Sequence, residues 1–593
     1  MSHIIDINGP IVRVKLPGAK NGEQVQVGAL QLVGEIIALE GDDAIVQVYE
    51  STDTLKPGDM VESIGYPLSV ELGPGLLGRI FDGVQRPLKD ISDLHGDHIP
   101  RGIRLPSLSR DRKWQYEPVD TLEAGAQITG GEIIGSVQET GIIEHKILVP
   151  PNVKGELVEL APAGEYTIEQ TIGRVKLDNG EIQKLHLFHR WPVRVPRPYD
   201  KRSKALTPLM TGQRILDCFF PLLKGGKAAV PGPFGAGKTM IQQQIARWAD
   251  ADIVIYVGCG ERGNELVDIL QSFPELTDPH SGLPLMDRTL IIANTSNMPV
   301  VAREASIYVG VTLAEYYRDQ GKDVVLLADS TSRWAEALRE VGGRLAHMPV
   351  EEGYPAYLAS RLAAFYERSG LVNALSGKKG SISLIGAVSP PGGDFSEPVT
   401  THTKEIIQTF WALSKELADA RHYPSVDWNA SFSEHINNVT KWWSKKVDPT
   451  WFSKRESAMS LLAQETELSR IVNLVGPEAL SSEQRWVLEG AALIREGVLQ
   501  QSALDPIDSY ASAEKQYVLL DLMLNIYRQG DELIDIGVPV QQLSELKVLA
   551  RARRLKSMYD SKQIQELRGF RNEIDEEFHQ IRAEYEKAGE QAS

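Results

Sequence analysis

The stretch GPFGAGKTM, Gly232 to Met240, constrains the chain more than any other because it fits the pattern G-x-x-x-x-G-K-[ST]. It follows KAAV (227–230), which is strand-like, and precedes TMIQQQIARWAD, which is helix-like. Its glycines would let backbone N–H groups turn toward phosphate oxygens, and the N-terminus of the helix favours the same negative charge. A chance match to so short a pattern is possible, but the strand and the helix on either side argue against one. The order of strand, loop and helix predicts a nucleotide-binding α/β domain.

Two side chains of this loop indicate how a nucleotide would be held. Lys238 would place a compact positive charge on the β- and γ-phosphates, and the Thr239 hydroxyl would ligate Mg²⁺. Asp329 ends the apolar stretch VVLLAD and would reach the same ion through water, although many strands end in Asp. We therefore predict Mg²⁺ with ATP or ADP as cofactor, and Thr239 and Asp329 as its ligands. The loop residues predicted to bind nucleotide are Gly232, Pro233, Phe234, Gly235, Ala236, Gly237, Lys238, Thr239 and Met240.

Hydrolysis also requires a group that orients water, and the candidate is Glu261 in GCGERGNE (258–265). It follows the predicted strand DIVIYVG, at the edge where ligands bind in such sheets. Arg262 beside it would be able to touch a phosphate oxygen. An acid that simply begins the next helix, where the helix dipole favours it, explains Glu261 equally well. From the residues alone, both interpretations stay open.

Composition limits the partners. The 593 residues include 63 Lys and Arg against 80 Asp and Glu, and the net charge of −17 argues against a main role in binding nucleic acid. The two cysteines, Cys218 and Cys259, are expected to be buried thiols in a reducing compartment. The N-terminus lacks the pattern of a secretory signal, and the longest apolar runs are strand-sized. We expect a soluble, cytoplasmic chain that meets a membrane only through partners.

The predicted elements divide the chain into five segments. Short β-branched stretches predict a β-barrel at 1–70, and a Gly- and Pro-rich linker with the first part of the nucleotide-binding domain follows at 71–110. Strand-like stretches such as GGEIIGSVQ predict an inserted β-rich module at 111–195. Strands and helices alternate over 196–435, which predicts a parallel, RecA-like α/β sheet, and 436–593 is predicted to be α-helical.

Four ordered motifs resemble one family. GPFGAGKT, GERGNE, DSTSRWAEALRE (329–340) and PSVDWNASFS (424–433) are together similar to the catalytic A subunit of V-type and archaeal-type rotary ATPases. The inserted module at 111–195 resembles the bulge that marks this subunit and that the catalytic subunit of F-type synthases lacks. Eukaryotic members carry a Cys in the glycine loop that serves as a redox lock. Ala236 stands there in this chain, so no such lock is expected and the resemblance is to a prokaryotic member.

The resemblance assigns roles to individual residues. It makes Glu261 the carboxylate that activates water and Arg262 a phosphate contact, so that the catalytic residues become Glu261, Arg262 and Lys238. Tyr423 stands where the related F-type subunit stacks an aromatic ring on adenine, although a packing tyrosine before a turn proline explains it as well. VLQQSALD (498–505) resembles the other wall of the adenine pocket and contributes Gln500 and Gln501. The family usually has Phe where Val498 and Leu504 stand, which puts base stacking from that side in doubt.

The resemblance also implies an assembly. Catalytic sites would lie at the interfaces of an alternating A3B3 ring, and a B subunit would supply the arginine finger. Central rotor stalk subunits would be pushed by the helical C-terminal domain, for which LVGPEALSSEQ (474–484) is the candidate lever tip, although an ordinary helix–helix turn fits that stretch too. A peripheral stator stalk and, indirectly, a membrane sector complete the predicted partners. The chain would lie on the inner face of a membrane and couple MgATP hydrolysis or synthesis to H⁺ or Na⁺ transport.

Two alternatives from other classes remain at this stage. A flagellar or secretion export ATPase, or a transcription-termination helicase, would also be a hexameric P-loop motor. Export ATPases lack the inserted module, and the acidic balance of the chain does not favour a helicase. A non-catalytic nucleotide-binding ring subunit would lack an intact glycine loop or the catalytic glutamate, and this sequence has both.

Overall fold

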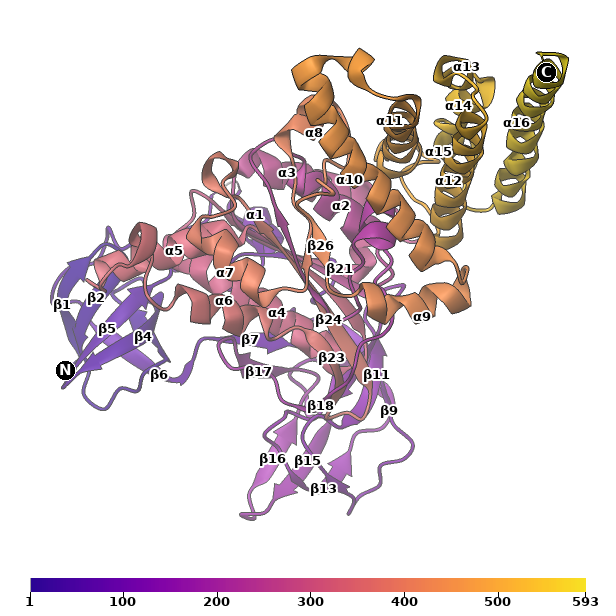
Figure 1. The fold of residues 1–593 in the computed structure, drawn as a ribbon. Helices are drawn as coiled ribbons and strands as arrows, with labels where there is room; N and C mark the ends of the chain where they lie inside the picture. The colour runs from indigo at the N-terminus through magenta and orange to yellow at the C-terminus, as the bar shows by residue number, and fades with distance from the viewer. Residues whose placement is uncertain (1, 97, 593) are drawn as a thin grey trace. The chain divides into compact units, whose positions relative to one another are not determined.

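The computed structural model describes residues 2–96 and 98–592 (Figure 1). The chain forms two compact units. The first unit comprises Met1–Ala205, Lys224–Ala229 and Ala251–Ile407. The second comprises Leu206–Leu223, Val230–Asp250 and Gln408–Ser593.

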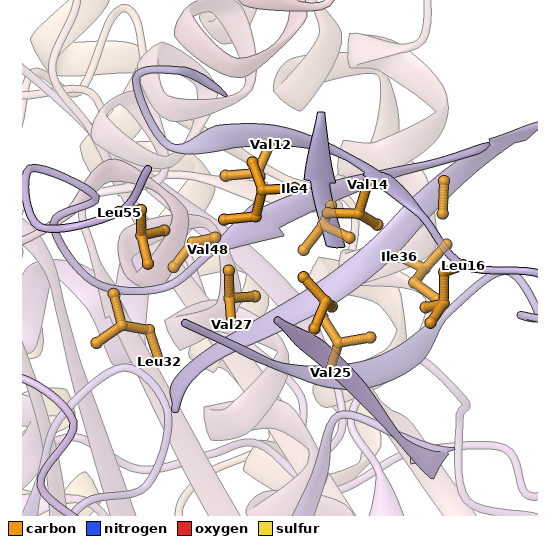
Figure 2. Packing of buried hydrophobic residues seen from close by; sticks show 13 residues of the cluster. Ile4, Val12, Val14, Leu16, Val25, Val27, Leu32, Ile36, Val48 and Leu55 are labelled. Atoms are coloured by element: carbon orange, nitrogen blue, oxygen red, sulfur yellow. The ribbon is translucent and has the colours of Figure 1, made fainter. Parts of the chain in front are cut away.

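The first unit begins with a six-stranded antiparallel barrel in the order β1-β2-β5-β4-β3-β6. Alternate side chains of its strands point inward, as the period of a β-strand requires, and form an aliphatic core that includes Val12, Val14, Val25 and Val27 (Figure 2). Burying each such side chain contributes about 1.5–3 kcal/mol to stability, which offsets the conformational entropy that a small domain loses on folding. The strands are β1 (His3–Asn8), β2 (Ile11–Lys15), β3 (Glu23–Val27), β4 (Leu32–Glu40), β5 (Asp43–Val48) and β6 (Val61–Pro67).

The inserted module consists of two four-stranded antiparallel sheets, β10-β13-β15-β16 and β12-β11-β9-β14 (Figure 1). Glu139 ties the module to the rest of the first unit. One of its carboxylate oxygens accepts hydrogen bonds from the backbone N–H groups of 75–77, and the other lies 2.6 Å from Nδ1 of His145. The strands are β9 (Lys113–Pro118), β10 (Gln127–Ile128), β11 (Ile133–Gln138), β12 (Glu144–Leu148), β13 (Gly155–Leu160), β14 (Gly164–Thr167), β15 (Gly173–Leu177) and β16 (Ile182–Leu185).

A parallel sheet in the order β24-β22-β20-β21-β8 forms the centre of the first unit. Its strands are almost continuously buried, which is typical of a parallel sheet whose faces are both covered. The strands are β8 (Ile80–Phe81), β20 (Ile253–Glu261), β21 (Thr289–Thr295), β22 (Asp323–Asp329) and β24 (Lys379–Val388). The helices of this unit are α1 (Leu88–His95), α3 (Gly263–Glu275), α4 (Val300–Asp319), α5 (Thr331–Arg344), α6 (Leu358–Tyr366) and α7 (Pro398–Ile406). Two antiparallel strand pairs, β7 (Ser69–Leu72) with β17 (His189–Pro192) and β18 (Tyr199–Arg202) with β23 (Gly370–Ala374), complete it.

The second unit contains the glycine loop, helix α2 (Lys238–Trp248) and a largely helical C-terminal part. Strand β19 (Lys227–Pro231), which leads into the loop, has its first three residues in the first unit and its last two in the second. Two single turns of π-helix, η1 (Ile215–Phe219) and η6 (Arg495–Leu499), also belong here. The remaining strands and α-helices are β25 (Thr409–Phe410), β26 (Phe432–Ser433), α8 (Lys415–Asp419), α9 (Ile436–Lys446), α10 (Trp451–Val475), α11 (Ser482–Ile494), α12 (Ala513–Asp535), α13 (Val540–Ser544), α14 (Lys547–Ala552), α15 (Leu555–Met558) and α16 (Ile564–Ala592).

The predicted fold class is confirmed: a β-barrel, a β-rich insert, a parallel α/β nucleotide-binding fold and a helical C-terminal part are all present. The predicted break at Gly476 is also found, because α10 ends at Val475 and α11 begins at Ser482 behind a capping box formed by Ser481 and Gln484. The charged segment after Ser544 is divided into three helices, of which only α16 is long.

Both cysteines are buried thiols, as predicted. Burial raises the pKa of each thiol to about 12, so neither is poised to react. Trp451 also donates its indole N–H to the Cys218 sulfur at 3.2 Å. Among the described residues, no helix combines the length and the apolar composition needed to cross a bilayer.

His435, at the start of α9, is expected to make the fold sensitive to acid. Its ring is buried, neither ring nitrogen has a hydrogen-bond partner among the described residues, and burial lowers its pKa to about 4. In the unfolded chain the pKa of His435 is near the ordinary 6.5. Between about pH 6.5 and 4 the ring therefore binds a proton in the unfolded chain but not in the folded chain. Stability is therefore lost as the pH falls through this window, by up to about 3 kcal/mol from this residue.

The measurement is urea unfolding of wild type and His435→Phe at several pH values. The Phe variant should lose less free energy of unfolding between pH 6.5 and 4, whereas replacing the exposed His579 with Gln should leave the wild-type slope unchanged. Equal slopes for wild type and His435→Phe would contradict the assignment.

Candidate active site

The residues predicted for the site belong to both units. The glycine loop, Tyr423, Gln500 and Gln501 lie in the second unit, and Glu261, Arg262 and Asp329 lie in the first.

The glycine loop has the backbone that binding of phosphate requires. Gly235 and Gly237 adopt left-handed conformations with φ of +82° and +88°, which side-chain-bearing residues rarely tolerate. Gly237 also caps the N-terminus of α2, so the loop ends where the first N–H groups of the helix and the positive end of its dipole begin. The Lys238 ammonium donates to the carbonyls of Gly232 and Pro233, at 2.7 and 3.1 Å, and so lies across the loop. Lys238 and Thr239 occupy the first turn of α2.

The segment around Tyr423 packs on the same loop. Ser425 donates its hydroxyl to the carbonyl of Ala236, which is buried within the loop. The Tyr423 ring lies beside Gly237, where an added Cβ would be 3.8 Å from the ring. Tyr423 is 43% exposed, and so it presents an aromatic face next to the loop instead of filling a core. Phe234 and Met240, at 71% and 43%, are also exposed apolar residues of the loop.

The segment 498–505 divides into buried and exposed positions. Val498 and Gln501 are buried, and Leu504 is 89% exposed. The Gln501 side chain accepts a hydrogen bond from the backbone N–H of Arg214 and donates to the carbonyls of Gly212 and Asp508, each at 2.8 Å. Its backbone N–H donates to the Tyr423 carbonyl at 2.7 Å. The Gln501 amide is thus engaged with the protein, while Gln500 is only partly buried.

In the first unit, Glu261 and Asp329 meet at the carboxyl edge of the parallel sheet. Glu261 is the last residue of β20, and Asp329 ends β22 in register with Gly258. Asp329 is almost fully buried and accepts a hydrogen bond from the Tyr256 hydroxyl at 3.1 Å. Burial, together with the charges and hydrogen bonds of Asp329 and Glu265, raises the pKa of Glu261 to about 8. A carboxyl group with such a pKa is a stronger base than an ordinary glutamate.

The position of Glu261 bears on the alternative left open by the sequence. Helix α3 begins at Gly263 with Arg262 as its N-cap residue, so Glu261 precedes the helix and belongs to the strand. The acid in the first turn of α3, where the helix dipole favours negative charge, is Glu265. Arg262 is exposed at this edge. Helix capping therefore accounts for Glu265 and not for Glu261.

Sequence reasoning missed several residues around these groups. Glu265 lies one helical turn after the strand and could have been found from the GERGNE motif. Ser425 lies in the motif PSVDWNASFS, but neither that motif nor the sequence around Tyr256 and Arg214 shows that each contacts a site residue that is distant in the sequence.

Comparison with known proteins identifies the family. The V-type ATP synthase alpha chain of Nitrosococcus oceani is 65% identical over 589 residues, which cover 99% of this chain and 100% of the relative. The A subunit of the A-type ATP synthase from a Desulfurococcus species is 52% identical, with 99% and 100% covered. The chain belongs to the A subunits of V/A-type ATP synthases. As such it is the catalytic subunit of a rotary, ion-coupled ATP synthase, as the sequence predicts.

Four parts of this A subunit match family descriptions. Residues 4–65 match the ATP synthase alpha/beta family beta-barrel domain, and 105–194 match its barrel-sandwich domain. Residues 212–433 match the nucleotide-binding domain of the same family, and 440–543 match the C-terminal domain of V and A type ATP synthases. The last match favours the V/A branch over the alternatives considered from the sequence.

A solved structure extends the likeness of the fold. The assembled ATPase EscN from the type III secretion system of enteropathogenic E. coli matches with a TM-score of 0.63 and 22% identity, over 88% of this chain and 100% of that one. At this identity the likeness concerns the fold alone. EscN thus has a fold similar to that of this chain, whereas the relatives at 52–65% identity belong to the ATP synthases.

Proposed function

We propose that this A subunit holds the phosphates of MgATP in the loop Gly232–Thr239 and that Glu261 activates the attacking water. The observation that carries the proposal is the backbone of the loop: two left-handed glycines turn it into the N-terminus of α2. Backbone N–H groups, the helix dipole and the Lys238 ammonium together favour a multiply charged anion there. Arg262, exposed at the end of β20, would add a further phosphate contact.

Mg²⁺ would be held by few protein groups. It prefers oxygen ligands, keeps several waters, and is usually bound through one or two protein groups together with phosphate oxygens. The Thr239 hydroxyl in the first turn of α2 and the Asp329 carboxylate at the end of β22 are ligands of this kind. Within the described residues, no group of three or more His, Cys, Asp or Glu is arranged to hold a metal. When bound, the ion would neutralise charge that develops on the phosphates.

Glu261 would act as the base that orients and polarises water. Its raised pKa of about 8 reflects burial and the neighbouring carboxylates Asp329 and Glu265, and it gives the carboxylate a high affinity for the proton of water. Tyr423 would contact the base of the nucleotide, since its exposed ring lies beside Gly237. Gln501 would serve this contact indirectly, by holding the Tyr423 backbone, and Gln500 would lie at the rim of the pocket.

We propose the partners that the family implies: a B subunit in an alternating A3B3 ring, central rotor stalk subunits and a peripheral stator stalk. An arginine finger from the B subunit would complete the site. The end of α10 supports a contact with the rotor, because Ile471, Leu474 and Val475 lie three and four residues apart on one helical face and are 41%, 84% and 65% exposed. Membership of a synthase complex would place the chain at the inner face of a membrane, reached through these partners.

The dependence on a B subunit can be measured directly. Purified chain alone should hydrolyse MgATP about 10³-fold or more slowly than the chain assembled with its B partner, because removing an arginine finger typically costs about 10³–10⁵ in rate. Steady-state release of phosphate, with and without the B subunit, provides the comparison, and the isolated B subunit is the control. Rapid turnover by the isolated chain would show that the finger is supplied in cis and would contradict the shared site.

A further inference from the structure

Arg214 is a buried cation whose hydrogen bonds all go to one segment of chain. Its side chain is 0% exposed. Nε donates to the Val498 carbonyl at 2.6 Å, Nη2 to the Gln500 carbonyl at 2.7 Å, and Nη1 to the Asp508 carboxylate at 2.7 Å. Its backbone N–H donates to the Gln501 side chain. The planar guanidinium therefore fixes the segment 498–508 at several points at once, with a rigid donor geometry that an ammonium on a flexible stem does not have.

Two lysines, the buried Lys515 and the partly buried Lys556, hold the same segment. Lys556 donates to the carbonyls of Glu496 and Gln500 at 2.6 and 2.9 Å, and also to the Gln500 side chain. Lys515 donates to the Ile507 carbonyl at 3.2 Å. Burial lowers the pKa of both ammonium groups to about 8, so keeping these charges beside Arg214 is unfavourable in itself. Such a cluster is better explained by a need to fix the geometry of the segment than by stability.

The local backbone supports this view. Arg214 immediately precedes η1, and Gln500 immediately follows η6. Turns of π-helix are rare and are frequently found at functional sites. Here the guanidinium of Arg214 links the start of one π-turn to the end of the other through its bonds to Val498 and Gln500.

A continuous set of contacts connects this segment with the glycine loop. The backbone N–H of Gln501 donates to the Tyr423 carbonyl at 2.7 Å, and two residues later Ser425 donates to the Ala236 carbonyl. All of these residues belong to the second unit. A shift of the segment 498–501 would therefore move the backbone of Tyr423, whose ring is exposed beside Gly237.

We propose that Arg214 is a positioning residue for the base of the nucleotide. Its side chain fixes the segment 498–501, and this segment in turn fixes Tyr423. This inference rests on the proposed contact between Tyr423 and the base. It assigns Arg214 to recognition of the nucleoside part of the substrate, not to the phosphates, which the loop binds with its own N–H groups and Lys238.

The test compares a ligand with a base and a ligand without one. Calorimetry on the full-length chain should show ADP binding about tenfold or more weakly to Arg214→Gln than to wild type, with binding of inorganic tripolyphosphate unchanged. In the assembled synthase, KM for MgATP should rise by a similar factor while kcat changes by about twofold or less, because the base is bound equally in the ground and transition states. The ADP affinity of Arg214→Lys should fall between those of wild type and Arg214→Gln, since an ammonium cannot reproduce the planar arrangement of the guanidinium donors.

The matched control is Arg455→Gln. Arg455 is also buried in the second unit and donates to a backbone carbonyl, that of Phe219 at 2.9 Å, but it makes no bond to 498–508. Arg455→Gln should lower the midpoint of thermal unfolding, as the loss of a buried arginine does, but it should not selectively weaken the binding of ADP. If Arg214→Gln does not fold, Asp508→Asn removes the carboxylate partner of Arg214 with little change of shape and should give the same selective loss.

Two results would overturn the proposal: an unchanged ADP affinity in a folded variant at Arg214 or Asp508, or equal weakening of ADP and tripolyphosphate. Tyr423→Ala distinguishes the role of Arg214 from the proposed contact between Tyr423 and the base. If it weakens ADP selectively and the Arg214 variants do not, the role of Arg214 fails while the base contact stands. If Tyr423→Ala also has no effect, the proposed base contact fails as well.

Discussion

Replacing Glu261 with Gln in the assembled synthase is expected to lower kcat for ATP hydrolysis by about 10²- to 10⁴-fold while MgATP still binds. Gln has nearly the shape of Glu and keeps a hydrogen bond to water, but it cannot accept the proton. Burial and the neighbouring Asp329 and Glu265 raise the pKa of Glu261, so its carboxylate form is a stronger base than that of an ordinary glutamate. Steady-state phosphate release gives kcat, and calorimetry with ADP reports whether the nucleotide site is intact.

Asp268→Asn is the matched control for Glu261→Gln. Asp268 is an exposed acid on α3, seven residues after Glu261, and its replacement removes the same charge without touching the end of β20. Its kcat should stay within about twofold of wild type, since surface changes away from a site have small effects. Turnover of Glu261→Gln within tenfold of wild type would rule out Glu261 as the base.

The fold could be predicted largely from local patterns. The strand KAAV, the glycine loop and the helix after it are found as β19, the left-handed turn and α2, because the loop sequence permits few other backbones. The Gly-Pro at 476–477 ends α10 as expected, since proline cannot continue a helix. The pattern over 436–593 predicts helices but not the interruptions at 553–554 and 559–563, near which Lys515 donates to the Lys556 carbonyl and the Ser512 N–H to the Ser561 hydroxyl.

The candidate site was predictable only in part. Motifs identify residues whose neighbours along the chain carry the signal, as for Lys238 and Glu261. They do not reveal that the Gln501 amide is engaged by Arg214, which lies 287 residues away in the sequence. The raised pKa of Glu261 likewise depends on the sheet register that sets Asp329 beside β20, and no local pattern contains that register.

Replacing Lys238 with Ala is expected to weaken the binding of ADP and of inorganic tripolyphosphate alike, each by about 100-fold. A charge-assisted hydrogen bond of this kind contributes up to about 3 kcal/mol, and the loss falls on the phosphates, which both ligands share. Lys238 lies across the loop on the carbonyls of Gly232 and Pro233, so its removal takes the fixed positive charge from the loop while the left-handed glycines remain. Calorimetry with the two ligands measures both affinities.

The pattern of loss separates the two halves of the nucleotide. Lys238→Ala should affect tripolyphosphate as strongly as ADP, whereas a change that displaces Tyr423 should affect ADP alone. Lys415→Ala, which removes an exposed lysine from α8 in the same unit, controls for the general loss of positive charge and should leave both affinities near wild type. If Lys238→Ala binds tripolyphosphate within about threefold of wild type, the loop holds the phosphates through its backbone N–H groups alone, and the lysine has no part in binding.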